Sequence, residues 1–137
     1  MQAVLTGDVV GSSGLSPEDH RKVVHIVKSA ADVFPDAVVG SVDVYSGDSW
    51  QMLLSDCSMS LRIALYLRAS LKREKAFSVD SRVSIAWGEA DMKQVNMERI
   101  SESTGDLFTV SGRGLKTLKK PSLMGFSSSE KNCFPWP

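Results

Sequence analysis

The apolar positions of the chain recur with two different spacings, and these spacings predict its secondary structure. Residues 3–10 are mostly apolar, which is typical of a buried strand. Ser16 and Pro17 form a helix start, and apolar side chains at helical spacing follow until Pro35. In chain order, the pattern predicts strands at 3–10, 37–45, 49–55, 81–91 and 121–128, and helices at 17–34, 57–75 and 105–120.

The order of these elements, β-α-β-β-α-β-α-β, predicts an α+β fold of the ferredoxin-like sandwich type. We expect a mainly antiparallel central sheet, with the hairpin 37–55 at its centre and the helices on one face. Trp50 and Trp87 are expected in the core, and Gln51 is expected to face solvent on the open side of the sheet. Gly112 and Gly114 lower the helix propensity of 105–120 by about 1 kcal/mol each relative to alanine.

Length and composition indicate the size of the domain and its net charge. With 137 residues, 42% of them hydrophobic, the chain is long enough for one domain with a substantial core. We expect that domain at 1–128, followed by a C-terminal tail at 129–137. Sixteen basic and sixteen acidic residues cancel, so no overall field favours nucleic acid as a partner. The basic runs 72–75 and 115–120 are interpreted as solvated helix ends.

Nothing in the sequence pattern indicates export or membrane insertion. Cys57 and Cys133 do not form a disulfide framework, and the N-terminal residues lack the pattern of a signal peptide. No apolar run reaches the ~18 residues that a membrane span needs. We therefore expect a cytoplasmic protein with no membrane partner.

Two aspartates carry the candidate chemistry. Asp8 interrupts the apolar strand 3–10, where an unpaired buried carboxylate is costly, and Asp48 lies at the tip of the hairpin. If the first strand pairs beside the hairpin, the two carboxylates converge, and a hard cation such as Mg²⁺ or Mn²⁺ would relieve their repulsion. The alternative is ordinary turn chemistry, with Asp48 serving the hairpin and Asp8 capping the Gly/Ser turn that follows it.

Four motifs, found in the same order, resemble those of class III nucleotidyl cyclases and together cover about residues 3–120. "GDVVGSS" resembles their first Asp-containing strand, "SGDSWQMLL" their Gly-Asp hairpin, "SRVSIAWGEAD" their next strand, and "GDLFTVSGRGL" the start of their G-D-x-V-N-x-A-x-R-L helix. The pattern is also similar to SatD-type bacterial proteins. The resemblance implies the cyclase-palm form of the α+β sandwich.

The resemblance also implies a role for each matched residue. Asp8 and Asp48 would hold two divalent ions, Mg²⁺ or Mn²⁺, with a further contact from the backbone carbonyl of Val9. Arg113 would stabilise the phosphoryl group during its transfer. Backbone amides of two turns would bind the phosphates. These turns contain Gly11, Ser12, Ser13 and Gly47. Sites in this family form between two subunits, so the implied partners are a nucleoside triphosphate and a second copy of the chain.

Two positions depart from the active cyclase pattern. Thr109 occupies the position of the asparagine that positions the ribose in cyclases, and Val44 occupies the position of the lysine that recognises adenine. Two hypotheses therefore stay open. The chain is either a metal-dependent nucleoside triphosphate-binding domain, with nucleotidyl transfer or cyclisation as its reaction, or a degenerate, non-catalytic module for dimerisation, ligand sensing or protein contacts.

Overall fold

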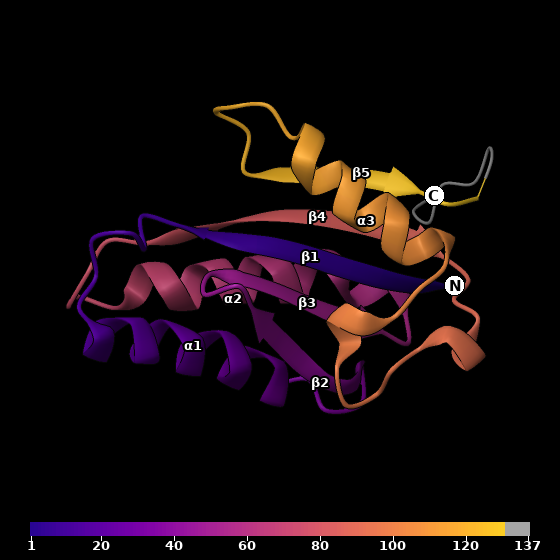
Figure 1. The fold of residues 1–137 in the computed structure, drawn as a ribbon, viewed down its shortest axis with the longest axis horizontal. Coiled ribbons are helices and arrows are strands. Elements are labelled where there is room, and N and C mark those ends of the chain that lie inside the picture. The colour runs from indigo at the N-terminus through magenta and orange to yellow at the C-terminus, as the bar shows by residue number, and fades with distance from the viewer. Residues whose placement is uncertain (131–137) are drawn as a thin grey trace.

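The computed structural model describes residues 1–130, and its elements follow the predicted order (Figure 1). The fold class is α+β, as expected. The strands are β1 (Gln2–Val10), β2 (Val38–Tyr45), β3 (Ser49–Leu54), β4 (Asp80–Gly88) and β5 (Met124–Ser128). The helices are α1 (Pro17–Asp32), α2 (Ser60–Arg73) and α3 (Asp106–Thr117), and three short 3₁₀ turns are η1 (Cys57–Met59), η2 (Met92–Gln94) and η3 (Ile100–Glu102).

The strands form one sheet in the order β2-β3-β1-β4-β5. Strand β1 pairs antiparallel with both β3 and β4, and β5 is parallel to β4, so the expectation of a mainly antiparallel sheet is confirmed. The hairpin β2–β3 lies at one edge of the sheet, and the expectation that it would be central is wrong. The central place belongs to β1, which is apolar on both faces and is therefore best buried between two neighbours.

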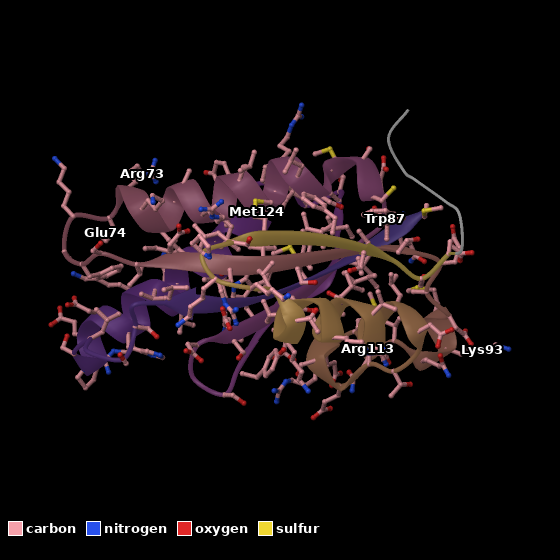
Figure 2. The ribbon with its side chains drawn as sticks, turned by 90° about the horizontal axis from the view of Figure 1, so that it is seen from above. Arg73, Glu74, Trp87, Lys93, Arg113 and Met124 are labelled. Atoms are coloured by element: carbon pink, nitrogen blue, oxygen red, sulfur yellow. The ribbon has the colours of Figure 1, made fainter. Side chains whose placement is uncertain are left out.

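Helices cover both faces of the sheet, which corrects the expectation that they lie on one face. Helices α1 and α2 pack on the face that carries Leu5, Met52 and Ile85, whereas α3 packs against β1 and β4 on the other face. Figure 2 shows α2 and α3 on opposite sides of β4 and β5. The reason is a second apolar surface of the sheet, which α3 buries with Leu107 and Phe108; its sheet residues are Val4, Leu53 and Ala86.

A chain of buried polar groups runs beneath α3. The Gln51 side-chain amide donates to Thr6 Oγ1 at 2.9 Å, and Thr6 Oγ1 lies 2.7 Å from Ser111 Oγ on the helix. Gln51 is only 6% exposed, so the expectation that it faces solvent is wrong, because α3 covers that face. Gly114 allows this close packing, since a Cβ atom there would lie 2.4 Å from Ser84 Oγ.

Trp50 fixes the alignment of β1 with β3. Its indole ring is fully buried and lies over Gly7, where a Cβ atom would come within 2.3 Å of Trp50 Cε2. The indole N–H donates to Ser81 Oγ at 2.9 Å, which ties the ring to β4 as well. Trp50 and Trp87 are both in the core, as predicted. The packing of the ring on Gly7 sets the pairing that places the next residue, Asp8, opposite Ser49.

The start of α1 is the one that the sequence predicts, because Ser16 Oγ accepts a hydrogen bond from the Asp19 amide at 3.1 Å. Of the expected tail 129–137, only Ser129 and Glu130 are described, and residues 131–137, with Cys133, lie outside the described part. The extent of the expected domain, 1–128, stays a prediction. None of the helices in residues 1–130 combines the length and the apolar character that crossing a membrane requires.

Candidate functional site

Asp8 and Asp48 line the same open pocket, which has a volume of about 450 Å³. Asp8 lies near the end of β1, and Asp48 immediately precedes β3. The Val9 amide donates to the Asp48 carbonyl at 2.9 Å, which holds the hairpin tip against the end of β1. Val9 lines the pocket too, together with Arg82 of β4 and the segment 120–123. The structure thus brings the two aspartates into the lining of one pocket, as expected if the first strand pairs beside the hairpin.

Arg82 holds the Asp8 carboxylate with two hydrogen bonds. Arg82 Nε donates to Asp8 Oδ1 at 3.0 Å and Nη2 donates to Oδ2 at 2.8 Å. The hydrogen bond with Asp8 raises the pKa of Arg82 above its ordinary value. Each carboxylate oxygen has two lone pairs, so the pairing with Arg82 still leaves Asp8 able to accept a cation. Asp8 is therefore compensated inside its own chain and does not need a metal ion to be tolerated in its strand.

The sequence alone indicates no role for Arg82. Asp8 and Arg82 are direct partners in the antiparallel pairing of β1 with β4, and opposite charges at such positions attract one another. The available signal was one acidic and one basic residue on two predicted strands. It becomes informative only when the pairing of those strands is known, because a shift by one residue would send the two side chains to opposite faces.

The position of Asp48 depends on the geometry of the hairpin. Ser46 and Gly47 both have positive φ angles, of 50° and 84°, and glycine adopts this conformation without strain. Tyr45 and Ser49 are paired on either side of the turn. Asp48 follows Gly47 in the chain and is half-buried. Ordinary turn chemistry thus accounts for the hairpin, and the hairpin places Asp48 in the lining of the pocket.

Tyr45 adds a neutral phenol that interacts electrostatically with Asp43 and Asp8. Burial raises its pKa above the ordinary value of 10.0, and the charges of Asp43 and Asp8 raise it further. A phenol with a raised pKa stays protonated at neutral pH and keeps its hydrogen-bond donor. The hairpin end of the sheet therefore offers a donor as well as carboxylates.

The two turns expected to meet phosphates lie next to the pocket in sequence but do not line it. Gly11 follows the lining residue Val10 with a φ of +87°, and the Ser12 carbonyl accepts the Leu15 amide at 3.1 Å. Ser13 and Gly47 are exposed. Their role in phosphate binding stays a prediction.

Arg113 and Thr109 lie on α3 and do not line the pocket of Asp8 and Asp48. Arg113 is exposed, and Figure 2 places it on the α3 side of the sheet. Within residues 1–130, no carboxylate forms an ion pair with it. Thr109 is exposed as well, and its hydroxyl donates to the Gly105 carbonyl at 3.1 Å. One copy of the chain therefore does not bring these residues to the aspartates.

The donor atoms at the pocket suit a hard cation when a ligand completes its shell. In the described part of the chain, no three His, Cys, Asp or Glu side chains gather closely enough to hold a metal ion. Asp8 and Asp48 provide carboxylate oxygens, and Mg²⁺ is commonly bound by one or two carboxylates together with substrate phosphates. The residues present thus fit Mg²⁺ or Mn²⁺ carried with a phosphate ligand, rather than a cage made entirely of protein groups.

A third carboxylate, that of the buried Asp43 on β2, serves the structure instead. Burial alone would raise the pKa of Asp43, but hydrogen bonds from the Ser101 side chain and amide and from Arg99 outweigh it, so the pKa is lowered. Ser101 Oγ donates to Asp43 Oδ2 at 2.5 Å, and Arg99 Nε lies 3.2 Å from the same oxygen. These bonds tie the irregular segment 92–104 to the sheet.

Comparison with known proteins identifies the fold. No protein-family model and no curated protein sequence matches this chain. Among solved structures, the guanylyl cyclase Cya2 is 21% identical with a TM-score of 0.57, over 84% of this chain and 68% of that one. The active GGEEF domain of a diguanylate cyclase from Vibrio cholerae is 10% identical with a TM-score of 0.63, over 95% of this chain and 83% of that one. The chain therefore has the palm-like α+β fold of these two cyclase domains.

Proposed function

We propose that this chain is a nucleoside triphosphate-binding domain that depends on a divalent cation, Mg²⁺ or Mn²⁺. The observation that carries the proposal is the position of Asp8 and Asp48, which come from separate elements and line one pocket. The pairing of β1 with β3 and the Val9–Asp48 backbone hydrogen bond fix both residues, so they line the pocket before any ligand arrives. Preorganised oxygen donors of this kind favour a hard cation, which in turn favours a polyphosphate.

The proposed reaction is nucleotidyl transfer, in which a hydroxyl oxygen bonds to the α-phosphorus of the triphosphate, loses its proton to solvent, and displaces pyrophosphate; in cyclisation this oxygen is the ribose 3′-hydroxyl. The cation, when bound, would supply Lewis-acid stabilisation of the phosphates. The chain itself would supply Asp8 and Asp48 to hold the ion and the backbone of Val9 beside them. Arg113 would neutralise charge on the phosphoryl group, since its planar fork of donors matches phosphate geometry. Because Arg113 and Thr109 lie away from the pocket, this arrangement requires a homodimer in which the partner provides them.

A second candidate function is supported by the Asp8–Arg82 pair. Both oxygens of Asp8 already accept hydrogen bonds from Arg82, so the strand is stable without a cation. A non-catalytic module that dimerises, senses a ligand or contacts another protein would retain this arrangement. The exposed Arg113 and the departures at Val44 and Thr109 fit the same hypothesis.

Thermal unfolding with Mn²⁺ and each nucleoside triphosphate in turn tests the proposal. A ligand at about 100 times its dissociation constant adds about 2.7 kcal/mol to the free energy of unfolding, which raises the unfolding temperature measurably. We expect a rise that needs both Mn²⁺ and nucleotide, that Asp48→Asn abolishes, and that the exposed-site control Asp36→Asn retains. No rise with any nucleotide would refute the proposal. Binding without release of pyrophosphate would favour the non-catalytic module.

A further inference from the structure

The connection between α3 and β5 forms one wall of the pocket. Arg82 Nη1 donates to the Leu118 carbonyl at 3.3 Å, so the same arginine that holds Asp8 also holds the end of the helix. The Val83 amide donates to the Leu123 carbonyl at 2.8 Å, at the other end of the connection. A turn closes between them, with the Ser122 amide donating to the Lys119 carbonyl at 2.8 Å. The segment 119–123 is therefore fixed beside Asp8.

Lys120 is the side chain of this segment that brings charge to the pocket. The charged groups that line the pocket are Asp8, Asp48, Arg82 and Lys120. Arg82 is engaged by Asp8, but among residues 1–130 no carboxylate forms an ion pair with Lys120. Among the described residues that line the pocket, Lys120 thus carries a positive charge without an ion-pair partner. The run 115–120 is predicted to be a solvated helix end, but the structure places one of its residues, Lys120, in the lining of the pocket.

We infer that Lys120 is the residue that binds the phosphates of the ligand from within the same copy of the chain. The inference rests on the proposed function, because it concerns the ligand of the same pocket. A cation held by Asp48 and the ammonium group of Lys120, which lines the same pocket, would together hold a polyphosphate. The phosphates would then extend from the hairpin tip towards the α3–β5 connection. This arrangement recognises a polyphosphate chain and makes no contact with a base.

The neighbouring lysine provides a matched control. Lys119 belongs to the same basic run and is exposed, but it does not line the pocket. Lys119 and Lys120 contribute equally to the net charge and to the long-range field of the protein. A difference between their substitutions therefore reports a local contact and not general attraction of an anion to a basic surface.

Binding of inorganic tripolyphosphate in the presence of Mn²⁺, measured by calorimetry, tests the inference without a base and without turnover. We expect Lys120→Met to weaken tripolyphosphate binding about tenfold, the effect of losing one charge-assisted hydrogen bond. We expect Lys119→Met to change it by less than about twofold and Lys120→Arg to restore most of it. Binding of Mn²⁺ alone should not weaken in Lys120→Met. The unfolding temperature of each variant without ligand shows that the fold is retained.

The outcomes separate the inference from the proposal on which it rests. Suppose that tripolyphosphate binding needs Mn²⁺ and Asp48, but that both lysine variants lower its affinity only slightly and to the same extent. This result would overturn the role of Lys120 and leave the proposed function intact. Equal and large losses in both lysine variants would also overturn it, because they would indicate only the general field. No binding of Mn²⁺ or of tripolyphosphate by the wild type would overturn both.

Discussion

Gly7→Ala tests the contact that places Asp8 beside the hairpin. The added Cβ atom would lie 2.3 Å from Trp50 Cε2, about 1 Å inside ordinary van der Waals contact, which begins at 3.4 Å. The ring has no room to move away, because it is fully buried and its N–H is bound to Ser81 Oγ. Strain of this kind costs about 1–3 kcal/mol, and loss of the indole hydrogen bond about 1 kcal/mol more.

We therefore expect Gly7→Ala to lower the free energy of unfolding by about 2–4 kcal/mol, or the unfolding temperature by about 10 °C. Urea denaturation followed by circular dichroism measures this without relying on tryptophan fluorescence, which Trp50 itself would disturb. Gly14→Ala is the matched control, because a Cβ atom there has no neighbour within 4 Å. It should change stability by less than about 0.5 kcal/mol.

A double-mutant cycle makes the test specific to the ring. In a Trp50→Leu background the clash is absent, so Gly7→Ala should be neutral or stabilising by up to about 1 kcal/mol, since alanine restricts the unfolded chain. The cost of Gly7→Ala should therefore disappear or reverse in the Trp50→Leu background. An equal cost in both, or a cost below about 0.5 kcal/mol in the wild type, would refute the packing argument.

Two further predictions concern the charged groups. The pKa of Asp43 lies below its ordinary 3.8, so the stabilisation from its ionised form is present above that pH and is lost as the pH falls below it. Asp43→Asn should cost about 1–3 kcal/mol at pH 7, and urea titrations at several pH values should show the difference from wild type narrowing below pH 4; a constant difference would contradict the assignment. Arg82→Met should tighten Mn²⁺ binding about tenfold, because a single charge about 6 Å from a divalent ion in water repels it by about 1.4 kcal/mol. Weaker Mn²⁺ binding in that variant, measured by paramagnetic resonance titration, would instead mean that Arg82 orients Asp8 for the ion.

Local signals were enough to predict most elements of the fold. The apolar run 3–10, the Ser16-Pro17 helix start and the hairpin turn at Asp48 each depend on residues a few positions apart. Backbone preference and one-sided burial act at that range, so the sequence by itself determined where strands and helices form and that the class is α+β. It also indicated Asp8 and Asp48 as candidates for one site.

Tertiary structure alone decided which faces and which partners these elements take. The pattern within a single strand does not reveal the second apolar face of the sheet. The sequence therefore predicts the wrong face for α3 and an exposed side chain for the buried Gln51. The pairing of Asp8 with Arg82 joins residues 74 positions apart. Lys120 reaches the pocket only because contacts with β4 hold the α3–β5 connection there. Such contacts depend on the pairing of distant segments, which local preferences do not specify.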